Sequence, residues 1–393
     1  MAMQRRDFLQ FSAGLGVAFF APTLALAGTL PAYRNLLILV ELKGGNDGLN
    51  MVVPYADPAY YALRPRIAIK RDEVLQLDAV TGLHPSLRAL MPLWQDRQLA
   101  ILQGVGYPQP NLSHFRSIEI WDTASRSDQT LQQGWLTRVF ARHPTPAAFS
   151  ADGILIGSQE LGPLAGGSRA VALSSTDQFL GNARLAMPAN AHGNAALEHL
   201  MKVETDIVKA ADGMKPTQGK IVLQTVFPKG AFGDVVRTAA QVIGNAEQTG
   251  KPVAVLRLTL GSFDTHQNQN GTQAGLLTQL GEGLVALKSA LIELNCWDST
   301  VISTYSEFGR RPRENQSGGT DHGTASAHFV LGGRVNGGLL GAAPQLNRLD
   351  GNGNLGHAID FRSVYASLIR QCWSIDDSDL AGAGAGALDL VRT

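Results

Sequence analysis

Three largely apolar runs, each as long as a β-strand and each followed by a polar cluster with an acidic residue, constrain the fold of this 393-residue chain most strongly. They cover residues 36–40, 253–258 and 300–305. Such runs are typical of central parallel strands that helices cover on both faces. Between the last two runs, leucines from 276 to 294 recur at helical spacing, as in the crossover helix that joins parallel strands. The sequence therefore predicts an α/β fold around a mostly parallel sheet.

The rest of the chain adds one further unit of this kind and one segment of different composition. Residues 87–94 indicate a short helix, and residues 99–106 indicate a strand that leads into the polar stretch 111–117. Residues 144–226 are rich in Ala, Gly and Ser and show weak periodicity, which indicates a cap with some helix. We therefore expect a single domain over residues 28–393, with residues 144–226 as an insertion or cap.

Acidic and histidine side chains collect after the predicted strands. Asp264 and His266 follow the second run, Glu307 follows the third, and Asp321 and His322 lie in a glycine-rich loop. Ligands of open parallel sheets bind beyond the carboxyl ends of the strands, which is where these segments fall. Carboxylate oxygens together with imidazole nitrogens suit zinc, manganese or a similar divalent ion. Each pair alone fits a capped turn or a hydrogen-bonded pair, but their joint occurrence predicts a metal site.

Two acids compete for a place in this site after the first strand. Glu41 directly follows the first apolar run at the rim of the sheet, whereas Asp47 lies in a glycine-rich loop that is able to fold back over the same rim. Glu41 fits equally well as a hydrogen-bond acceptor behind a ligand, and Asp47 fits a simple Asp-Gly turn. The sequence leaves both alternatives open.

Ser113 is the candidate nucleophile. Its hydroxyl needs a neighbouring base or a metal ion to react near neutral pH, and the adjacent His114 and Arg116 are suited to orienting a tetrahedral oxyanion. Ser113 also fits the N-cap of a helix that continues through Trp121. The two roles are compatible, because a helix N-terminus also stabilises a bound anion. No serine lies in a G-x-S-x-G motif, which disfavours a metal-free serine hydrolase.

The first 27 residues have the pattern of a twin-arginine export signal. Arg5 and Arg6 precede an apolar stretch of small residues, which ends in the sequence Ala-Leu-Ala at 25–27. That stretch is shorter than the ~20 residues that span a bilayer and contains Pro22, which disfavours a retained anchor. We therefore expect a periplasmic or secreted protein that the twin-arginine translocon exports in a folded state. No later segment has the length and hydropathy of a membrane span.

Charge and cysteine content bear on the class of protein. The chain has 33 basic and 33 acidic residues, and cleavage of the signal removes only two arginines and one aspartate. A nearly neutral protein lacks the basic surface that nucleic-acid binding requires. Cys296 and Cys372 are the only cysteines. They form one disulfide in an oxidising compartment or remain two buried thiols.

Several longer motifs resemble those of a known family. They are LKGGNDGLN at 42–50, the segment 104–117, FDTH at 263–266, SEFGRR at 306–311, GTDHG at 319–323 and DFR at 360–362. With these motifs the chain is similar, from the signal to about Trp373, to the exported family called domain of unknown function 1501. That family in turn resembles the alkaline phosphatase and sulfatase superfamily.

The resemblance implies a fold, a cofactor and a set of roles. The fold is an alkaline-phosphatase-like three-layer α/β/α sandwich with the Ala/Gly-rich segment as an inserted cap. The cofactor is one or two divalent ions of zinc, manganese, calcium or magnesium. Ser113 is then the nucleophile, and Glu41 or Asp47 is the first-strand acid. The ligands from later strands are Asp264, His266, Glu307, Asp321 and His322. The chain departs from the superfamily pattern where Phe308, rather than a histidine, follows Glu307, so the number of ions is left open.

The hypothesis from sequence is an exported metal-dependent hydrolase of phosphate or sulfate esters that acts through Ser113. Its substrate is a small-molecule or polymer-linked phosphate or sulfate ester. The alternative is a non-catalytic exported protein that uses the same fold for metal binding, ligand capture or assembly. Specificity resides in loops and in the segment 144–226, so the sequence does not identify the ester.

Overall fold

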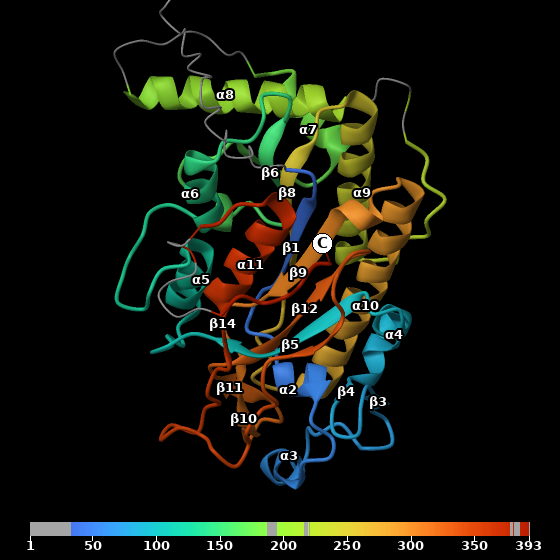
Figure 1. Ribbon diagram of the computed structural model, residues 1–393, viewed down its shortest axis with the longest axis vertical. Coiled ribbons are helices and arrows are strands. Elements are labelled where there is room, and N and C mark those ends of the chain that lie inside the picture. Colours follow the sequence, from blue (N-terminus) through green and yellow to red (C-terminus); the bar gives the residue numbers. More distant parts are fainter. Residues whose placement is uncertain are drawn as a thin grey trace, which may run out of the picture. The chain divides into compact units, whose positions relative to one another are not determined.

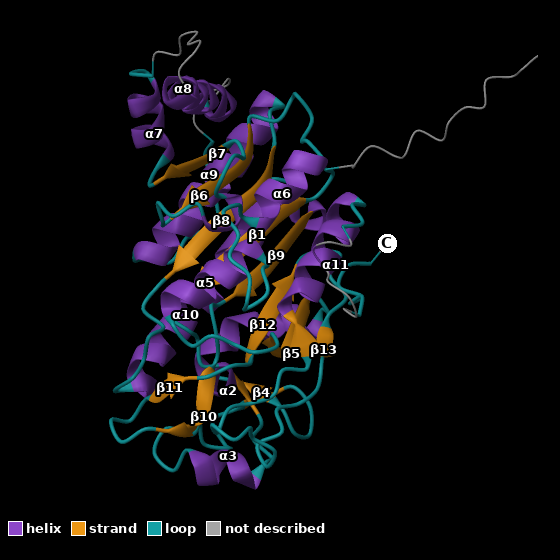
Figure 2. Cartoon of the chain, turned by 90° about the vertical axis from the view of Figure 1, so that its left-hand side faces the viewer, coloured by secondary structure: helices purple, strands orange, loops and turns teal. Residues whose placement is uncertain are grey.

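A nine-stranded sheet runs through the centre of the protein, as the computed structural model shows (Figures 1 and 2). The strand order is β13-β5-β12-β9-β1-β8-β6-β7, and β14 also pairs with β5. Strand β12 is antiparallel to β9 and β5, whereas the other pairings are parallel. The strands are β1 (Leu36–Leu42), β5 (Leu99–Gly106), β6 (Ala151–Ile156), β7 (Ala170–Leu173), β8 (Val253–Leu260), β9 (Thr300–Tyr305), β12 (Ser326–Leu331), β13 (Gly338–Leu340) and β14 (Ile359–Asp360).

The structure describes residues 33–186, 195–215, 219, 221–377, 380 and 386–392. The export signal expected at residues 1–27 lies outside these described residues. By its contacts, the chain from residue 33 to residue 393 forms one compact unit. Within the described ranges, no helix has both the length and the apolar character needed to cross a membrane.

Helices cover both faces of the sheet and produce three layers (Figure 2). Ile38 and Val40 of β1 pack into one core with α9 and α10, whereas Leu37 and Leu39 pack into a second core with α5, α6 and α11. Both faces of β1 are buried, which is why its sequence shows no polar alternation. The helices are α5 (His114–Thr123), α6 (Trp135–Arg142), α9 (Ala231–Thr249), α10 (Gln269–Glu293) and α11 (Phe361–Trp373). The predicted α/β sandwich with a mostly parallel sheet is confirmed.

Smaller elements gather beyond the carboxyl ends of the parallel strands, in the lower part of Figure 1. Two of them form an antiparallel pair, and three others form a second small sheet. The pair consists of β10 (Arg310–Glu314) and β11 (Thr320–His322); the small sheet consists of β2 (Val52–Val53), β4 (Gly82–Leu83) and β3 (Leu75–Gln76); two short helices are α2 (Gly48–Met51) and α3 (Pro58–Leu63).

The segments predicted from sequence correspond closely to structural elements. Residues 99–106 are β5, residues 300–305 are β9, and the leucines from 276 to 291 lie in α10. Residues 87–94 lie in a 3-10 helix, η1 (Pro85–Leu90), and in α4 (Met91–Gln95). The segment 144–226, which we expected as an insertion or cap, supplies β6 and β7 to the central sheet. It also supplies η2 (Gly162–Leu164), α7 (Thr176–Ala183) and α8 (Ala195–Met214).

The two cysteines are free and buried. Cys296 packs into the core on the α9 and α10 face of the sheet, and Cys372 packs into the core on the opposite face. The sheet therefore separates them, and of the two possibilities stated above the structure shows the two thiols. Burial raises the pKa of each thiol to about 12, so both are protonated at neutral pH.

A buried ion pair fixes the loop that follows β1. Asp47 is the N-cap of α2, and its Oδ1 accepts a hydrogen bond of 3.1 Å from the Leu49 amide. Arg64 binds both carboxylate oxygens, with Nη1 2.5 Å from Oδ2 and Nη2 3.1 Å from Oδ1. The side chain of Arg64 is fully buried and that of Asp47 is 1% exposed. Neither charge has access to bulk water, so each depends on the other.

We predict that Asp47→Ala strongly destabilises the protein, because it leaves the Arg64 guanidinium buried without its counter-ion. Breaking one partner of a buried ion pair costs about 3–5 kcal/mol of unfolding free energy. Asp57→Ala is the matched control: Asp57 also caps a short helix, α3, through a 2.9 Å bond from the Ala59 amide, but no ion pair with an arginine is found for it among the described residues. Losing that cap costs about 1 kcal/mol. Equal losses in urea unfolding of the two variants would contradict this account.

Candidate metal centre

Loops that follow β1, β8 and β9 meet at the carboxyl end of the sheet. The Gly44 amide, after β1, donates to both carboxylate oxygens of Glu307, after β9, at 2.9 and 3.1 Å. Gly44 has a φ of 119°, and a Cβ atom there would lie 2.5 Å from the backbone nitrogen of Asp264, after β8. A side chain would thus collide with the neighbouring backbone, so glycine is what lets the loops approach each other. The close approach places Asp264 and Glu307 side by side.

Three histidines surround the Asp264 carboxylate. His266 Nε2 lies 3.1 Å from Asp264 Oδ1, and His322 Nε2 lies 3.5 Å from the same oxygen. His114 Nε2, from the first turn of α5, lies 3.5 Å from Oδ2. The Nε2 atoms of His266 and His322 are 3.0 Å apart. We call these four residues the histidine cluster.

Two of the rings are oriented by acceptors behind them. His114 Nδ1 lies 2.9 Å from Glu307 Oε1, and His322 Nδ1 lies 2.7 Å from the carbonyl oxygen of Leu112. An ionised carboxylate and a carbonyl only accept hydrogen bonds, so Nδ1 carries the hydrogen in both rings. In a neutral ring, Nε2 then presents a lone pair toward Asp264. Carbonyl and carboxylate acceptors orient metal-binding histidines in proteins in the same way.

Asp321 takes the same position behind the third ring. Its Oδ1 lies 3.4 Å from His266 Nδ1, with both side chains about half exposed. Glu307 and Asp321, which we expected among the ligands, therefore contact the outer nitrogens of His114 and His266 in this structure. The residue that takes a ligand-like position in addition to the expected ones is His114.

The cluster fits a divalent cation by the position of its lone pairs. Because the His322 hydrogen is on Nδ1, His266 Nε2 donates to His322 Nε2 across 3.0 Å when no cation is bound. With the His266 hydrogen on Nδ1 instead, toward Asp321, the two Nε2 atoms are acceptors that face each other and the Asp264 carboxylate. Atoms bound about 2.0–2.1 Å from a tetrahedral zinc ion lie roughly 3.3 Å from one another. The separations among these three groups are 3.0, 3.1 and 3.5 Å. Imidazole with carboxylate suits zinc better than calcium or magnesium, which prefer oxygen ligands.

The surroundings shift the pKa values of the cluster in different directions. The hydrogen bond to Glu307 raises the pKa of His114, whereas burial lowers the pKa of His322. Burial opposes ionisation of Asp264, but the hydrogen bond and positive charge of Arg310 outweigh it and lower the pKa of that carboxyl. A neutral His322 beside an ionised Asp264 is the protonation state that binds a cation.

Arg310 joins the loops beneath the cluster, and its guanidinium is fully buried. Nε donates to the Gly45 carbonyl at 2.6 Å, Nη1 to the Thr320 carbonyl at 2.9 Å, and Nη2 to Asp264 Oδ1 at 2.7 Å. Nη2 also donates to the carbonyls of the residues just before Gly45 and Asp264. Sequence reasoning did not single out this residue. The signal available was its place in the motif 306–311, but its burial follows only from the tertiary structure.

Glu41 and Asp47, the two candidates for the first-strand acid, lie outside the cluster. Glu41 is fully buried, and Arg257 Nη2 and Thr259 Oγ1 donate to its Oε2 at 2.7 and 3.0 Å. It lies on the same face of β1 as Leu39, since strand side chains alternate, and this face points into the core. Asp47 is held by the buried arginine described above. Each carboxylate is therefore neutralised within the fold.

Ser113 begins α5, directly before His114, but its hydroxyl forms no capping hydrogen bond. The backbone amide of this exposed residue donates to Asn111 Oδ1 at 2.9 Å. Of the two roles considered from the sequence, the helix cap is thus not formed by the side chain. Ser113 is therefore an exposed residue that directly precedes His114 of the histidine cluster in the sequence.

Arg116 is bound to the loop that follows α5. Its Nη2 donates to the carbonyls of Ser127 and Gln129 at 3.2 and 2.6 Å, and its Nη1 lies 2.7 Å from Glu119 Oε1. We expected Arg116 to orient an oxyanion, but these contacts hold the guanidinium on residues 126–129. Arg310 is instead the arginine that contacts Asp264.

A cleft of about 940 Å³ opens beside the cluster, with Asp264 and Glu307 among its lining residues. One face of α5 forms a wall of this cleft, because the lining residues recur at helical spacing. From this helix the lining residues are His114, Phe115, Ile118, Glu119, Asp122 and Thr123. Phe115 is 88% exposed although it is aromatic. His114 and Asp264 of the cluster thus lie where a molecule in the cleft would meet them.

Comparisons with solved structures find distant similarity. The crystal structure of Ps i-CgsB has a TM-score of 0.41 and 13% identity, over 89% of this chain and 75% of that one. The C-terminal periplasmic domain of EcEptC from Escherichia coli, in complex with Zn, has a TM-score of 0.36 and 10% identity, over 78% and 73%. The PsFucS1 sulfatase from Pseudoalteromonas sp. has a TM-score of 0.34 and 12% identity, over 86% and 67%.

Comparison with curated protein sequences finds no match. The model of one protein family, described as "Protein of unknown function (DUF1501)", matches residues 79–350. The matched region runs from the residues before η1 to the loop between β13 and β14, and it includes all four residues of the histidine cluster. Because the match covers more than half of the chain, this protein belongs to the DUF1501 family.

Proposed function

We propose that this protein is an exported hydrolase of phosphate or sulfate esters that depends on a divalent ion, with zinc as the best fit. The observation that carries the proposal is the convergence of three Nε2 atoms on the Asp264 carboxylate at the edge of a 940 Å³ cleft. Export rests on the twin-arginine pattern of residues 1–27. The proposed ligands are His114, Asp264, His266 and His322.

The residues around the ligands determine how the site would act. Glu307 and the Leu112 carbonyl hold two imidazoles with Nε2 toward Asp264, so that these nitrogens need no reorganisation before they bind. Arg310 keeps Asp264 ionised and in place. A divalent ion held by these residues supplies Lewis-acid stabilisation of the charge that develops on the ester oxygens. The cleft positions the remainder of the ester.

In the proposed reaction, Ser113 is the nucleophile. Its Oγ forms a bond to phosphorus or sulfur as the bond to the alcohol oxygen breaks, and the alcohol leaves with a proton. Water then cleaves the ester on Ser113, which regains its hydroxyl hydrogen and releases phosphate or sulfate. The absence of a capping bond to the Ser113 side chain supports this role, because the hydroxyl is free to turn toward the substrate.

The first prediction on this function concerns metal content. Wild-type protein purified without chelator should hold about one zinc per chain by elemental mass spectrometry. His322→Ala and Asp264→Ala should lose it, since each removes a ligand. Glu307→Gln should weaken binding by roughly 10–100-fold, because it replaces the charged carboxylate that orients His114 with a neutral amide.

His328→Leu is the matched control for the metal variants. His328 is fully buried in β12, neither ring nitrogen has a hydrogen-bond partner in the described structure, and burial lowers its pKa to about 3. This neutral histidine should be replaceable without loss of zinc. Metal loss in this variant, or full zinc content in Asp264→Ala, would remove the histidine cluster as the binding site.

The second prediction concerns turnover. Zinc-loaded wild-type protein should hydrolyse 4-nitrophenyl phosphate or 4-nitrophenyl sulfate, and Ser113→Ala should lower kcat at least ~100-fold with zinc still bound, because the nucleophile is gone. Ser127→Ala, which removes only a 2.9 Å hydrogen bond to the Pro108 carbonyl, serves as the control. Bound zinc without turnover of either ester would favour the alternative, a non-catalytic metal-binding protein. Unchanged kcat in Ser113→Ala would exclude the covalent step.

The charged residues of the cleft limit which charge the leaving group of the ester can carry. Lys43 pairs with Glu160 at 2.6 Å, and Glu119 pairs with Arg116 at 2.7 Å. Burial raises the pKa of Asp122 to about 8, so that carboxyl is protonated near neutral pH. The cleft beyond the cluster therefore presents no unpaired cation among the described residues. It suits an ester whose leaving group is uncharged or cationic.

We predict that an added carboxylate on the leaving group impairs hydrolysis. Phenyl phosphate that carries a meta-carboxylate should be hydrolysed with a kcat/KM about tenfold below that for phenyl phosphate itself, a penalty of ~1.4 kcal/mol. Glu160→Gln should reduce this difference in kcat/KM, because it removes the carboxylate that pairs with the Lys43 ammonium group. Glu73→Gln, which alters an exposed ion pair with Lys70, should leave the difference unchanged. A preference of the wild-type enzyme for the carboxylated ester would contradict the assignment of the cleft.

A further inference from the structure

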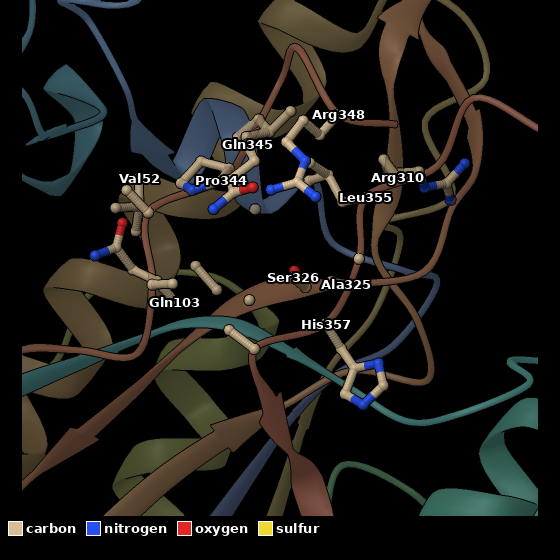
Figure 3. A pocket seen from close by; sticks show the side chains of 18 residues that line it. Val52, Gln103, Arg310, Ala325, Ser326, Pro344, Gln345, Arg348, Leu355 and His357 are labelled. Atoms are coloured by element: carbon tan, nitrogen blue, oxygen red, sulfur yellow. The ribbon is translucent and has the colours of Figure 1, made fainter. Parts of the chain in front are cut away.

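A second hollow lies on the edge of the sheet formed by β5, away from the histidine cluster. β13 pairs with residues 100–102 of β5, and β14 pairs with residues 105–106. The chain between β13 and β14, residues 341–358, leaves the sheet at this point. Its loop and the stretch of β5 at Gln103 and Gly104, which lies between these two pairings, enclose a cavity of about 270 Å³ (Figure 3).

The floor of this cavity is a β-bulge. Ser326 of β12 lies opposite Val105 of β5, but His328 lies opposite Leu102, so β5 has one extra residue between the two pairs. Gly104, within the bulge, has a φ of 67°. Ser326 is 5% exposed, and its Oγ donates to the Asn46 carbonyl at 3.2 Å. Bulges of this kind occur frequently beside binding sites, because they redirect side chains out of the regular sheet.

The cavity is electrostatically one-sided. Its titratable lining residues are Arg310, Arg348 and His357, and no acidic residue lines it in the described structure. The guanidinium of Arg310 points away from the cavity, whereas Arg348 and Gln345 extend into it from one wall (Figure 3). Arg348 forms no ion pair with any described residue. Asp350, two residues further on, accepts hydrogen bonds from the amides of Asn352 and Asn354 instead.

The remaining surface of the cavity is mostly apolar. Apolar residues line the rest of the wall; they include Leu49, Val52, Ala327, Ala343, Pro344 and Leu355. One water molecule occupies about 30 Å³. The cavity volume is several times larger, so the cavity is larger than a single small anion with its hydration water requires. It is smaller than the roughly 300–1,000 Å³ of pockets for drug-sized ligands. The size therefore matches a small organic molecule.

We propose that this cavity binds a small amphipathic carboxylate. The carboxylate accepts hydrogen bonds from the Arg348 guanidinium and the Gln345 amide, and the hydrocarbon part packs over Ala343 and Leu355. An arginine fork matches both oxygens of a carboxylate. The site is separate from the proposed active site and does not depend on the ester-hydrolase proposal.

Calorimetric titration of the chelator-treated full protein with hexanoate tests this site. Hexanoate should bind saturably with about one site per chain. Hexanamide, which keeps the chain but lacks the charge, should bind at least ~10-fold more weakly, because hydrogen bonds to charged groups are about twice as strong as neutral ones. Acetate should also bind more weakly, because it lacks the apolar part.

Three variants locate the binding. Arg348→Gln should weaken hexanoate about tenfold and leave hexanamide unchanged, whereas Ala343→Phe should weaken both ligands by filling the cavity. Both positions are exposed, so neither change should disturb folding. Arg334→Gln, at an exposed arginine that does not line the cavity, is the control. Equal affinity for hexanoate and hexanamide, or unchanged hexanoate affinity in Arg348→Gln, would overturn the proposal. So would hexanoate binding that is seen only after zinc is added back, because it would place the anion at the histidine cluster.

Discussion

The buried guanidinium of Arg310 is the contact on which the arrangement of the candidate metal centre depends. Its donors reach carbonyls of the loops after β1 and β8, a carbonyl of β11 and the carboxylate of Asp264. Burying an unpaired charge costs several kcal/mol, so these loops are held in an arrangement that gives each guanidinium nitrogen an acceptor. Lysine lacks the planar fork that spans several acceptors at once. Asp264 is thereby kept ionised in a position that would be unfavourable for a carboxylate without this partner.

The sequence identified the strands that contain a long, largely apolar run and missed the shorter or more interrupted ones. β1, β8 and β9 were recognisable because burial on both faces favours a mostly apolar run, although β8 contains Arg257 and β9 contains Ser303 and Thr304. β6 contains Gly153, where an added Cβ would lie 2.3 Å from Leu164, so the packing that requires glycine also weakened the strand pattern. The short strands β13 and β14 have too few residues for any period. Their place is fixed by pairing with β5, a tertiary contact that no local pattern predicts.

The same distinction applies to the site. That Asp264, His266 and His322 would meet was predictable, because parallel strands deliver their carboxyl ends to one edge. The sequence did not predict which side chains face Asp264 and which contact the outer nitrogens of the histidines, because this depends on the orientation of the imidazole rings. Glu307 and His114 illustrate this: they form one hydrogen-bonded pair, and only the geometry of the pair shows that the imidazole is the member facing Asp264. The position of Glu41 at the rim of the sheet suggested a role at the site. The alternation of side chains along β1 instead directs Glu41 into the core.

The two proposed binding sites would bind anions by different means. In the cleft, Lys43 is already paired with Glu160, so an anionic group gains a favourable partner only at the histidine cluster and its proposed metal ion. In the β5 cavity, Arg348 is unpaired among the described residues, so the protein itself supplies the charge. Removal of metal should therefore abolish anion binding in the first case and leave it intact in the second. Arg310 contributes to the wall of the cavity while its guanidinium fixes Asp264. Because that guanidinium is held by several loops, a ligand in the cavity meets a rigid wall rather than a movable one.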